Sequence, residues 1–225
     1  MRHRTFIAIN LPEEIKKKLS EYEGKWPELP IRWTKEENLH ITLIFLGYLS
    51  DEELLEICKI TKEVASRNQS FSINLNKICY GPRTGPPATR EGLASRPKKM
   101  LPRSMSPSGS FPRSSHFSIE SRTPRMIWVN GEKSREFTAL KDDIEKSLGT
   151  SERVSFSPEK RVFSPHITLG RIRAWEFRQI EPEERPEVDE DIDLSFEVSS
   201  IEAMESQLKR GGPNYTVLES APLKS

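Results

Sequence analysis

Apolar and polar positions follow two different periods along this chain, and the changes of period divide it into strands and helices. Alternating apolar runs predict strands at 5–10, 39–46 and 71–78, because every second side chain of a strand shares a face. Apolar residues three or four positions apart predict helices at 12–24 and 51–68. Ser50 precedes the second helix as an N-cap.

The periodic pattern stops at residues 84–124, which hold seven of the 17 prolines, nine serines and almost no regular apolar positions. Such a segment cannot bury enough surface to offset the entropy lost on ordering, so we predict a disordered or loosely packed insertion. Its seven Lys or Arg against two Glu make it basic. It is either an arm that gathers the phosphates of a nucleic acid or a surface insertion that its charge keeps soluble.

Order resumes after this segment. We predict a strand at 126–129, a helix from about Phe137 to Leu148 and a strand at 166–172, followed by strands around 193–203 and 215–219. The acidic run 181–191 is interpreted as a solvated connection.

A repeat links the two parts of the chain, since each contains a strand, a helix, a loop and then the tetrapeptide His-Ile-Thr-Leu. Phe6 precedes the first tetrapeptide by 34 residues and Ile127 precedes the second by 39. The repeat predicts an α+β fold over residues 1–225: one domain of two pseudo-symmetric lobes, each with an antiparallel sheet and helices, and with the insertion 84–124 between them.

Each tetrapeptide carries a histidine and a threonine two residues apart, His40 with Thr42 and His166 with Thr168. Both polar side chains of a pair therefore lie on one face of a strand. If a pseudo-twofold axis relates the lobes, the pairs face each other across a central groove. Imidazoles titrate near neutral pH, so one can act as a base and the other as an acid, while threonine hydroxyls donate to an oxyanion.

Other candidate residues are assigned structural roles. His3 and His116 are predicted to be solvated, and Trp33 and Trp128 to be part of the core. The two cysteines, Cys58 and Cys79, are isolated and indicate neither a zinc site nor a disulfide framework.

Composition adds few constraints. The balance of 35 Lys and Arg against 34 Asp and Glu says nothing about nucleic-acid binding, and no apolar run is long enough to span a membrane. We expect a cytoplasmic monomer that needs no metal or cofactor.

At these motifs the chain resembles the 2H phosphoesterase superfamily, specifically its RNA 2′,3′-cyclic phosphodiesterase branch, also called 2′–5′ RNA ligase-like. The matching stretches are 6–12, 38–47 and 165–171. The resemblance implies metal-independent hydrolysis of RNA 2′,3′-cyclic phosphate ends to 2′-phosphomonoesters, with 2′–5′ ligation as the reverse reaction. It implies that His40 is the proton donor and His166 the proton acceptor, although the sequence symmetry makes the two equivalent. It also implies that Thr42 and Thr168 hold phosphate oxygens.

Two more residues follow from the resemblance, which implies a phosphate contact for Arg171 and a base-stacking role for Phe45. Each lies five positions after its motif histidine. An odd separation puts a side chain on the opposite face of a regular strand, so we expect a bulge near Gly170 if Arg171 is to turn inward. For Phe45, a place in the core is the alternative.

Two other functions remain open. One is a phosphodiesterase for other cyclic or 2′,5′-linked nucleotides, which would use the same histidines. The other is a catalytically inactive RNA-binding module, against which the presence of both histidines and both threonines argues.

Overall fold

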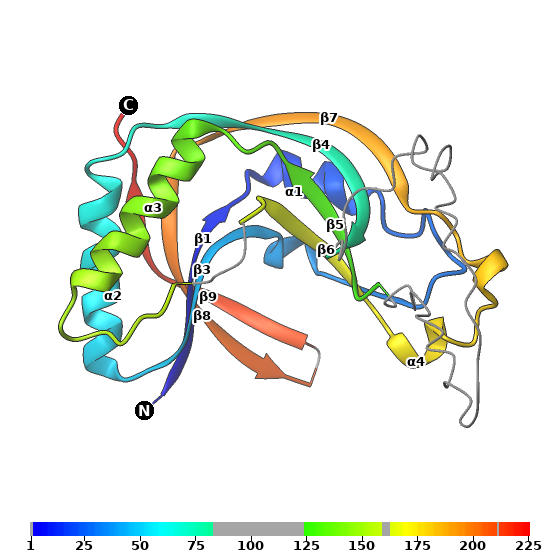
Figure 1. Cartoon of the computed structure of the whole chain (residues 1–225), viewed down its shortest axis with the longest axis horizontal. Helices are drawn as coiled ribbons and strands as arrows, with labels where there is room; N and C mark the ends of the chain where they lie inside the picture. Colours follow the sequence, from blue (N-terminus) through cyan, green and yellow to red (C-terminus); the bar gives the residue numbers. More distant parts are fainter. Residues whose placement is uncertain (1, 83–123, 159–162, 211) are drawn as a thin grey trace, which may run out of the picture.

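Within the described residues, nine strands form one curled antiparallel sheet (Figure 1). The structure is a computed structural model and describes residues 2–82, 124–158, 163–210 and 212–225. The strands are β1 (His3–Asn10), β2 (Ile31–Trp33), β3 (His40–Leu49), β4 (Phe71–Gly81), β5 (Met126–Gly131), β6 (His166–Ile172), β7 (Asp189–Val198), β8 (Ser200–Lys209) and β9 (Gly212–Pro222).

The strand order β7-β4-β5-β6-β3-β1-β8-β9 divides at its centre into two similar halves. From the centre outward, one half reads β3, β1, β8, β9 and the other reads β6, β5, β4, β7, while β2 pairs with β6. The halves meet where Ile41 of β3 pairs with Ile167 of β6 in antiparallel register. These are the same position of the repeated tetrapeptide, and antiparallel pairing of equivalent residues is what a pseudo-twofold axis produces. The predicted α+β fold with pseudo-symmetric lobes is confirmed.

Helices cover the face of the sheet away from the groove. The longer ones, α2 (Asp51–Ala65) and α3 (Arg135–Thr150), lie side by side on the left of Figure 1. Short helices complete the fold: α1 (Glu13–Ser20), α4 (Ala174–Phe177) and the 3-10 turns η1 (Glu36–Asn38) and η3 (Pro182–Glu184). Within the described residues, none of the helices has the length and apolar character needed to cross a lipid bilayer.

Ser50 is the N-cap of α2, as the sequence predicts, and it also forms a capping box with Glu53. The backbone N–H of Glu53 donates to the Ser50 hydroxyl at 3.3 Å, and the backbone N–H of Ser50 donates to the Glu53 carboxylate at 2.7 Å. Two of the N–H groups at this helix end that have no partner within the helix are thereby satisfied.

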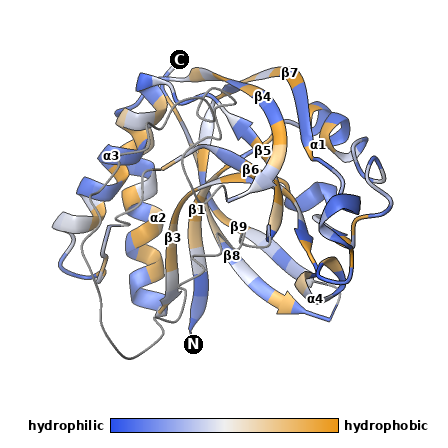
Figure 2. Cartoon of the chain, turned by 45° about the vertical axis from the view of Figure 1, so that its right-hand side comes forward, coloured by the Kyte–Doolittle hydropathy of each residue, from blue (hydrophilic) through white to orange (hydrophobic). Residues whose placement is uncertain are grey.

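Strand β1 is buried on both faces, which explains its continuous apolar run. Ile7 and Ile9 pack into the main core with the helices, whereas Phe6 and Ala8 pack with Met204 on the groove side. The hydropathy colouring of Figure 2 shows the apolar centre of the sheet and the banded helices that cover it. An apolar floor therefore lies under part of the groove.

The predicted strand at 193–203 is wrong, because the chain bends at Ser199 and makes two strands there, β7 and β8. Both flanking segments favour extended backbone, so periodicity alone did not reveal the bend. The predicted connection at 181–191 is also partly wrong, since β7 begins at Asp189. Acidic side chains are compatible with this strand because β7 is an edge strand with one partner, β4, and many exposed positions.

The predicted insertion 84–124 lies almost wholly outside the described residues, and so does His116. The described ends on its two sides meet: Gly81 pairs with Met126, and the backbone N–H of Arg125 donates to the Gly81 carbonyl at 3.3 Å. Segment 83–123 thus joins two neighbouring antiparallel strands.

Candidate active site

The central strand pair brings the two tetrapeptides into contact. Because Ile41 lies opposite Ile167, the antiparallel register sets His40 beside Thr168 and Thr42 beside His166. Both isoleucines are fully buried on the core side, whereas the four polar side chains are half-buried and line one cavity. Two histidines and two threonines, predicted from the repeat, thus share one face of the sheet.

Matching β-bulges lie at the last residue of each motif. On β3, Ile7 pairs with Ile44 and Ala8 with Thr42, which leaves Leu43 as an extra residue. On β6, Ile127 pairs with Gly170 and Trp128 with Thr168, which leaves Leu169 as the extra residue. A bulge shifts the alternation of side chains by one.

These bulges decide where the fifth residue after each histidine lies. Phe45 and Arg171 are both exposed and both line the cavity with the histidines. The expected bulge that turns Arg171 inward is therefore present, and the core alternative for Phe45 is wrong.

Two backbone carbonyls fix the tautomers of the histidines. The carbonyl of Asn38 accepts from Nδ1 of His40 at 2.7 Å, and that of Ser164 accepts from Nδ1 of His166 at 2.8 Å. In each case the carbonyl lies two residues before the ring. Since a carbonyl can only accept, Nδ1 carries the proton in the neutral ring and Nε2 presents a lone pair. The Thr42 hydroxyl donates to this lone pair of His40 at 3.0 Å.

Burial lowers the pKa of both histidines below the ordinary value. For His40, the backbone carbonyl of Asn38 raises the pKa in part, while the charges of His166 and Lys16 lower it further. For His166, burial is again the main cause, and the Ser164 carbonyl opposes it. Burial therefore favours neutral imidazoles, and a bound anion would favour a proton on one of them.

Aromatic rings hold both imidazoles in place. Phe6 and Tyr215 lie 5.0 and 5.1 Å from His40, centroid to centroid, with Tyr215 edge-on. Trp128 stacks on His166 at 3.8 Å with an interplanar angle of 24°. The prediction that Trp128 is a core residue is therefore wrong, because its ring covers one face of a motif histidine. Trp33 is only partly buried; it packs against the core and also lines the cavity.

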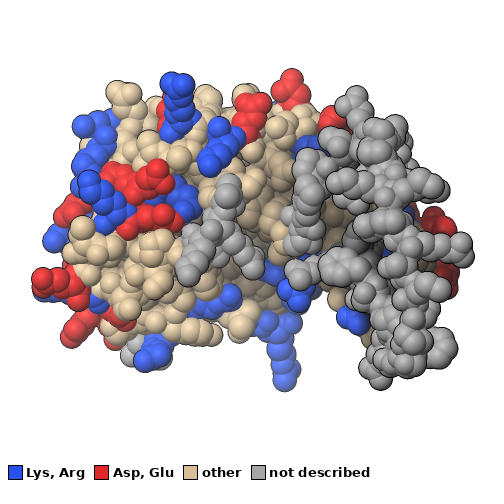
Figure 3. All heavy atoms as spheres, viewed as in Figure 1, with Lys and Arg blue, Asp and Glu red and all other residues tan. Residues whose placement is uncertain are grey.

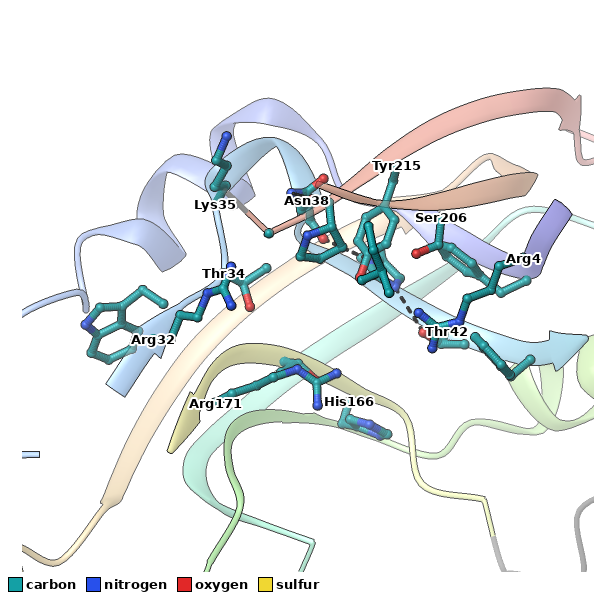
Figure 4. A pocket seen from close by; sticks show the side chains of 18 residues that line it. Arg4, Arg32, Thr34, Lys35, Asn38, Thr42, His166, Arg171, Ser206 and Tyr215 are labelled. Atoms are coloured by element: carbon teal, nitrogen blue, oxygen red, sulfur yellow. Dashed lines mark hydrogen bonds between the residues drawn. The ribbon is translucent and has the colours of Figure 1, made fainter. Parts of the chain in front are cut away.

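The cavity around the motifs has a volume of about 580 Å³ and is electropositive. Four cationic side chains line it, and none of the described lining residues is Asp or Glu. Figure 4 shows Arg171 and His166 on β6, across the cavity from Arg4, Ser206 and Tyr215. The cations are Arg4, Arg32, Lys35 and Arg171.

The basic character continues outside the cavity. Figure 3 shows Lys and Arg along the lower centre of the face viewed. A neighbouring shallow depression is lined by Arg2, Arg4 and Lys209, with Glu205 as its one described carboxylate. A polyanionic chain would therefore meet positive charge on entering the groove.

Sequence reasoning did not identify Ser206 and Tyr215, which reach the cavity from β8 and β9. Ser206 is 6% exposed, and its hydroxyl has no hydrogen-bond partner among the described residues. Burial raises the pKa of Tyr215, so its phenol stays protonated and able to donate. Neither residue belongs to a sequence motif. Ser206 reaches the groove because β8 pairs with β1, which the local sequence does not reveal.

His3 also differs from its prediction of a solvated side chain. Its Nδ1 lies 2.7 Å from Glu205 and its Nε2 lies 2.7 Å from Asp51, and these contacts raise its pKa. It does not line the cavity. Among the described residues, no group of three or more His, Cys, Asp or Glu is arranged to hold a metal ion.

Comparison with known proteins agrees with this geometry. The family model described as LigT like Phosphoesterase matches residues 9–89, which include the first motif. The chain is 30% identical over 192 residues to an RNA 2′,3′-cyclic phosphodiesterase of Aeropyrum pernix, covering 84% of this chain and 85% of the relative. It is 26% identical over 217 residues to one of Methanocaldococcus jannaschii, covering 96% and 98%. The crystal structure of TT0787 of Thermus thermophilus matches with a TM-score of 0.70 at 26% identity, covering 99% of this chain and 98% of that one.

Proposed function

Because this chain belongs to the LigT-like phosphoesterases and is an enzyme of the RNA 2′,3′-cyclic phosphodiesterase class, we propose that its two His-Ile-Thr-Leu motifs open the cyclic phosphate at an RNA end. The observation that carries the proposal is the antiparallel pairing of Ile41 with Ile167. That pairing supports a phosphate seated over the centre of the sheet, with one histidine on either side of it.

The bare Nε2 of His166 is suited to act as the general base. It takes a proton from water, and the water oxygen attacks phosphorus. The bond from phosphorus to O3′ then breaks in line, and protonated His40 donates to O3′ from Nε2. The product is a 2′-phosphomonoester. In both neutral rings the proton is on Nδ1, so Nε2 can accept a proton in His166 and, once it is protonated, donate one in His40.

Thr42 has a second role in this cycle. When His40 is neutral, the Thr42 hydroxyl donates to Nε2 of that ring. Once His40 is protonated, Nε2 becomes a donor, and the Thr42 hydroxyl hydrogen is free to turn toward a phosphate oxygen. Thr168 lies on the same face and supplies a hydroxyl from the other half. Arg171 offers a guanidinium, which matches two phosphate oxygens at once.

We propose that the reaction needs no metal, since the histidines move the protons and the cations of the groove neutralise the phosphate. The same opening of the cyclic phosphate gives 2′–5′ ligation when a 5′-hydroxyl takes the place of water, and cleavage of a 2′–5′ linkage is the reverse of that ligation. A monomer would suffice, because one chain supplies both halves of the groove. A cytoplasmic location stays a prediction.

We propose that a nucleobase stacks on one face of the Phe45 ring only. The Arg4 guanidinium lies 4.8 Å from the ring centroid and covers the other face. Since the ring is 53% exposed, a base can still stack on its open face.

The test is incubation of the EDTA-treated protein with an oligonucleotide ending in a 2′,3′-cyclic phosphate, with the product read by phosphorus NMR. We expect a 2′-phosphate from the intact enzyme and from His3→Ala, whose histidine lies outside the cavity, and its formation about 10²- to 10⁴-fold more slowly from His166→Ala. A 3′-phosphate would reverse the assigned leaving group, and inhibition by EDTA would contradict the metal-free reaction. Turnover of other cyclic or 2′,5′-linked nucleotides alone would favour the alternative substrates.

A further inference from the structure

The shallow depression beside the cavity has a volume of about 390 Å³ and lies over strands β1, β3 and β8. Arg4, Ser206 and Leu208 line both the cavity and the depression, so the two form one continuous surface. The strands β3, β1 and β8 are neighbours in the sheet and belong to the half that holds His40. The depression therefore extends the groove on the side of the proposed proton donor.

The proposed chemistry sets the direction in which the RNA leaves the cavity. O3′ departs toward His40, and water attacks from the side of His166, opposite the leaving group. O2′ and O3′ both belong to the ribose of the last nucleotide, so this ribose lies on the His40 side of the phosphate. The strand that continues from the same ribose therefore starts over the half formed by β3, β1, β8 and β9.

Three cationic side chains line this path. Arg4 lies where the cavity meets the depression, whereas Arg2 and Lys209 line the depression alone. Within the part of the chain that the structure describes, none of the three makes an ion pair. The one described carboxylate here, Glu205, lies 2.7 Å from Nδ1 of His3 and raises the pKa of that ring, so a protonated His3 offsets its charge. Positive charge therefore remains available for the phosphates of a bound strand.

A tyrosine stands beside these cations on the groove face. Tyr48 of β3 pairs directly with Arg4 of β1, and residues that are directly opposite share a face. Phe45 lies three positions before Tyr48, and side chains with that spacing face opposite sides of a regular strand. A second bulge corrects this, because Leu46 has no partner on β1 and Gly47 has a positive φ of 81°. Both aromatic rings therefore lie on the face of the groove.

Exposed apolar side chains are concentrated on this surface. Six large ones are exposed among the described residues, and three of them, Phe45, Tyr48 and Leu208, line the cavity or the depression. Tyr48 is 62% exposed, so its ring is open to a partner. Exposed aromatic rings among cations suit single-stranded nucleic acid, because bases stack on the rings while the cations hold the phosphates.

We infer that the shallow depression binds the nucleotides that precede the cyclic phosphate of a single-stranded RNA. One base stacks on Tyr48, and Arg2, Arg4 and Lys209 hold the phosphates. This inference rests on the proposed function of the cavity, because the position of the terminal ribose sets where the strand continues. A nucleoside 2′,3′-cyclic phosphate reaches the cavity alone, so the enzyme favours an oligonucleotide over a mononucleotide.

The experiment compares kcat/KM for adenosine 2′,3′-cyclic phosphate with kcat/KM for the trinucleotide ApApA that carries the same cyclic end. Tyr48→Ala and Lys209→Ala are the test variants, because both residues line the depression and neither lines the cavity. Trp175→Ala and Lys146→Ala are the matched controls, since each removes an exposed ring or charge that lines neither place. Thermal unfolding checks the fold of each variant.

We expect the wild type and both controls to prefer the trinucleotide. Tyr48→Ala should lower kcat/KM for the trinucleotide by about five- to 150-fold, which corresponds to the loss of one stacked base, and should leave the mononucleotide unaffected. Tyr48→Phe keeps the ring and should keep the preference. Lys209→Ala should reduce the slope of log kcat/KM against log salt for the trinucleotide by about 0.7, which corresponds to one phosphate contact.

Equal kcat/KM for the two substrates would overturn the inference, and so would a preference that survives both Tyr48→Ala and Lys209→Ala. A parallel loss on both substrates would overturn it as well, since it would assign these residues to the cavity. Each of these results would leave the proposed hydrolysis standing. If the wild type hydrolyses neither substrate, the proposed function is refuted; the affinity of the same variants for ApApA with a 2′-phosphate end, measured by fluorescence anisotropy, then decides the inference.

Discussion

Removal of the Arg171 guanidinium gives the sharpest test of the groove, because a bulge alone directs this side chain to the motif face. The extra residue Leu169 shifts the alternation of β6, so that Arg171 lines the cavity with His166 instead of facing the core. Arg171 is exposed, and its backbone pairing with β2 and β5 does not depend on its side chain. Arg171→Ala should therefore fold normally.

The expected magnitude follows from the charge of the contact. A hydrogen bond to a charged group contributes about 1.5–3 kcal/mol, which corresponds to a loss of about 10- to 150-fold in kcat/KM. Arg171→Lys keeps the charge but loses the two-pronged geometry, so its loss should be smaller than that of alanine. Inorganic phosphate should also inhibit Arg171→Ala more weakly than the wild type.

The assay is hydrolysis of a nucleoside 2′,3′-cyclic phosphate, with thermal unfolding as the check on folding. Arg173→Ala is the matched control, because Arg173 lies two residues away, pairs with Glu176 in an exposed ion pair and lines neither the cavity nor the shallow depression. Arg171→Ala with wild-type kcat/KM and unchanged phosphate inhibition would refute the phosphate contact. An equal loss in both variants would assign the effect to the local fold.

Three further predictions concern the histidines and the core. His40→Ala and His166→Ala should each lower kcat by about 10²- to 10⁴-fold with little change in Tm, and near-normal turnover of both would refute the acid–base pair. Burial lowers the pKa of both rings below 6.5, so the doubly neutral form predominates above that pH and the free enzyme loses the protonated His40 that the reaction needs. The decline of kcat/KM with rising pH should therefore begin below pH 6.5, whereas the kcat profile shifts upward on anion binding; a kcat/KM that rises as the pH increases above 6.5 would contradict the assignment. Phe137 is fully buried and contacts the rings of Phe71 and Phe163, so Phe137→Ala should lower the free energy of unfolding by about 3–5 kcal/mol in a denaturant titration. A loss below about 1 kcal/mol would mean that neighbouring side chains move in to fill the cavity.

The motif strands could be predicted from the sequence because local pattern and tertiary role agree there. His40 and His166 alternate with isoleucines that are fully buried, so the alternation in the sequence and the burial in the structure assign the same side chains to the core. The repeat adds the symmetry, which no single motif carries. The helix at Ser50 was predictable for a similar reason, since its capping box is complete within four residues.

Other features depend on partners far away in the chain. Ser206 reaches the groove because β8 pairs with β1, and Trp128 reaches His166 because β5 pairs with β6. Neither pairing can be predicted from the apolar and polar pattern of the strands involved. Strand β2 has three residues, too few for a period, and is held by its register with β6. The bulge on β3 was likewise hidden, because Leu43 and Ile44 are both apolar and both buried.

The order of the strands has a consequence for synthesis of the protein on the ribosome. Strand β4 from the first part of the chain lies between β5 and β7, and the last hairpin, β8–β9, completes the half that β1 and β3 begin. The half made of β4, β5, β6 and β7 comes from consecutive strands of the chain, whereas the other half cannot close until β8 and β9 join β1 and β3. The nascent chain therefore exposes the unpaired edge of β1 until β8 emerges, and such an edge is open to non-native strand pairing. The half that holds the first histidine is the last to close, so the groove forms only after β9 has been made.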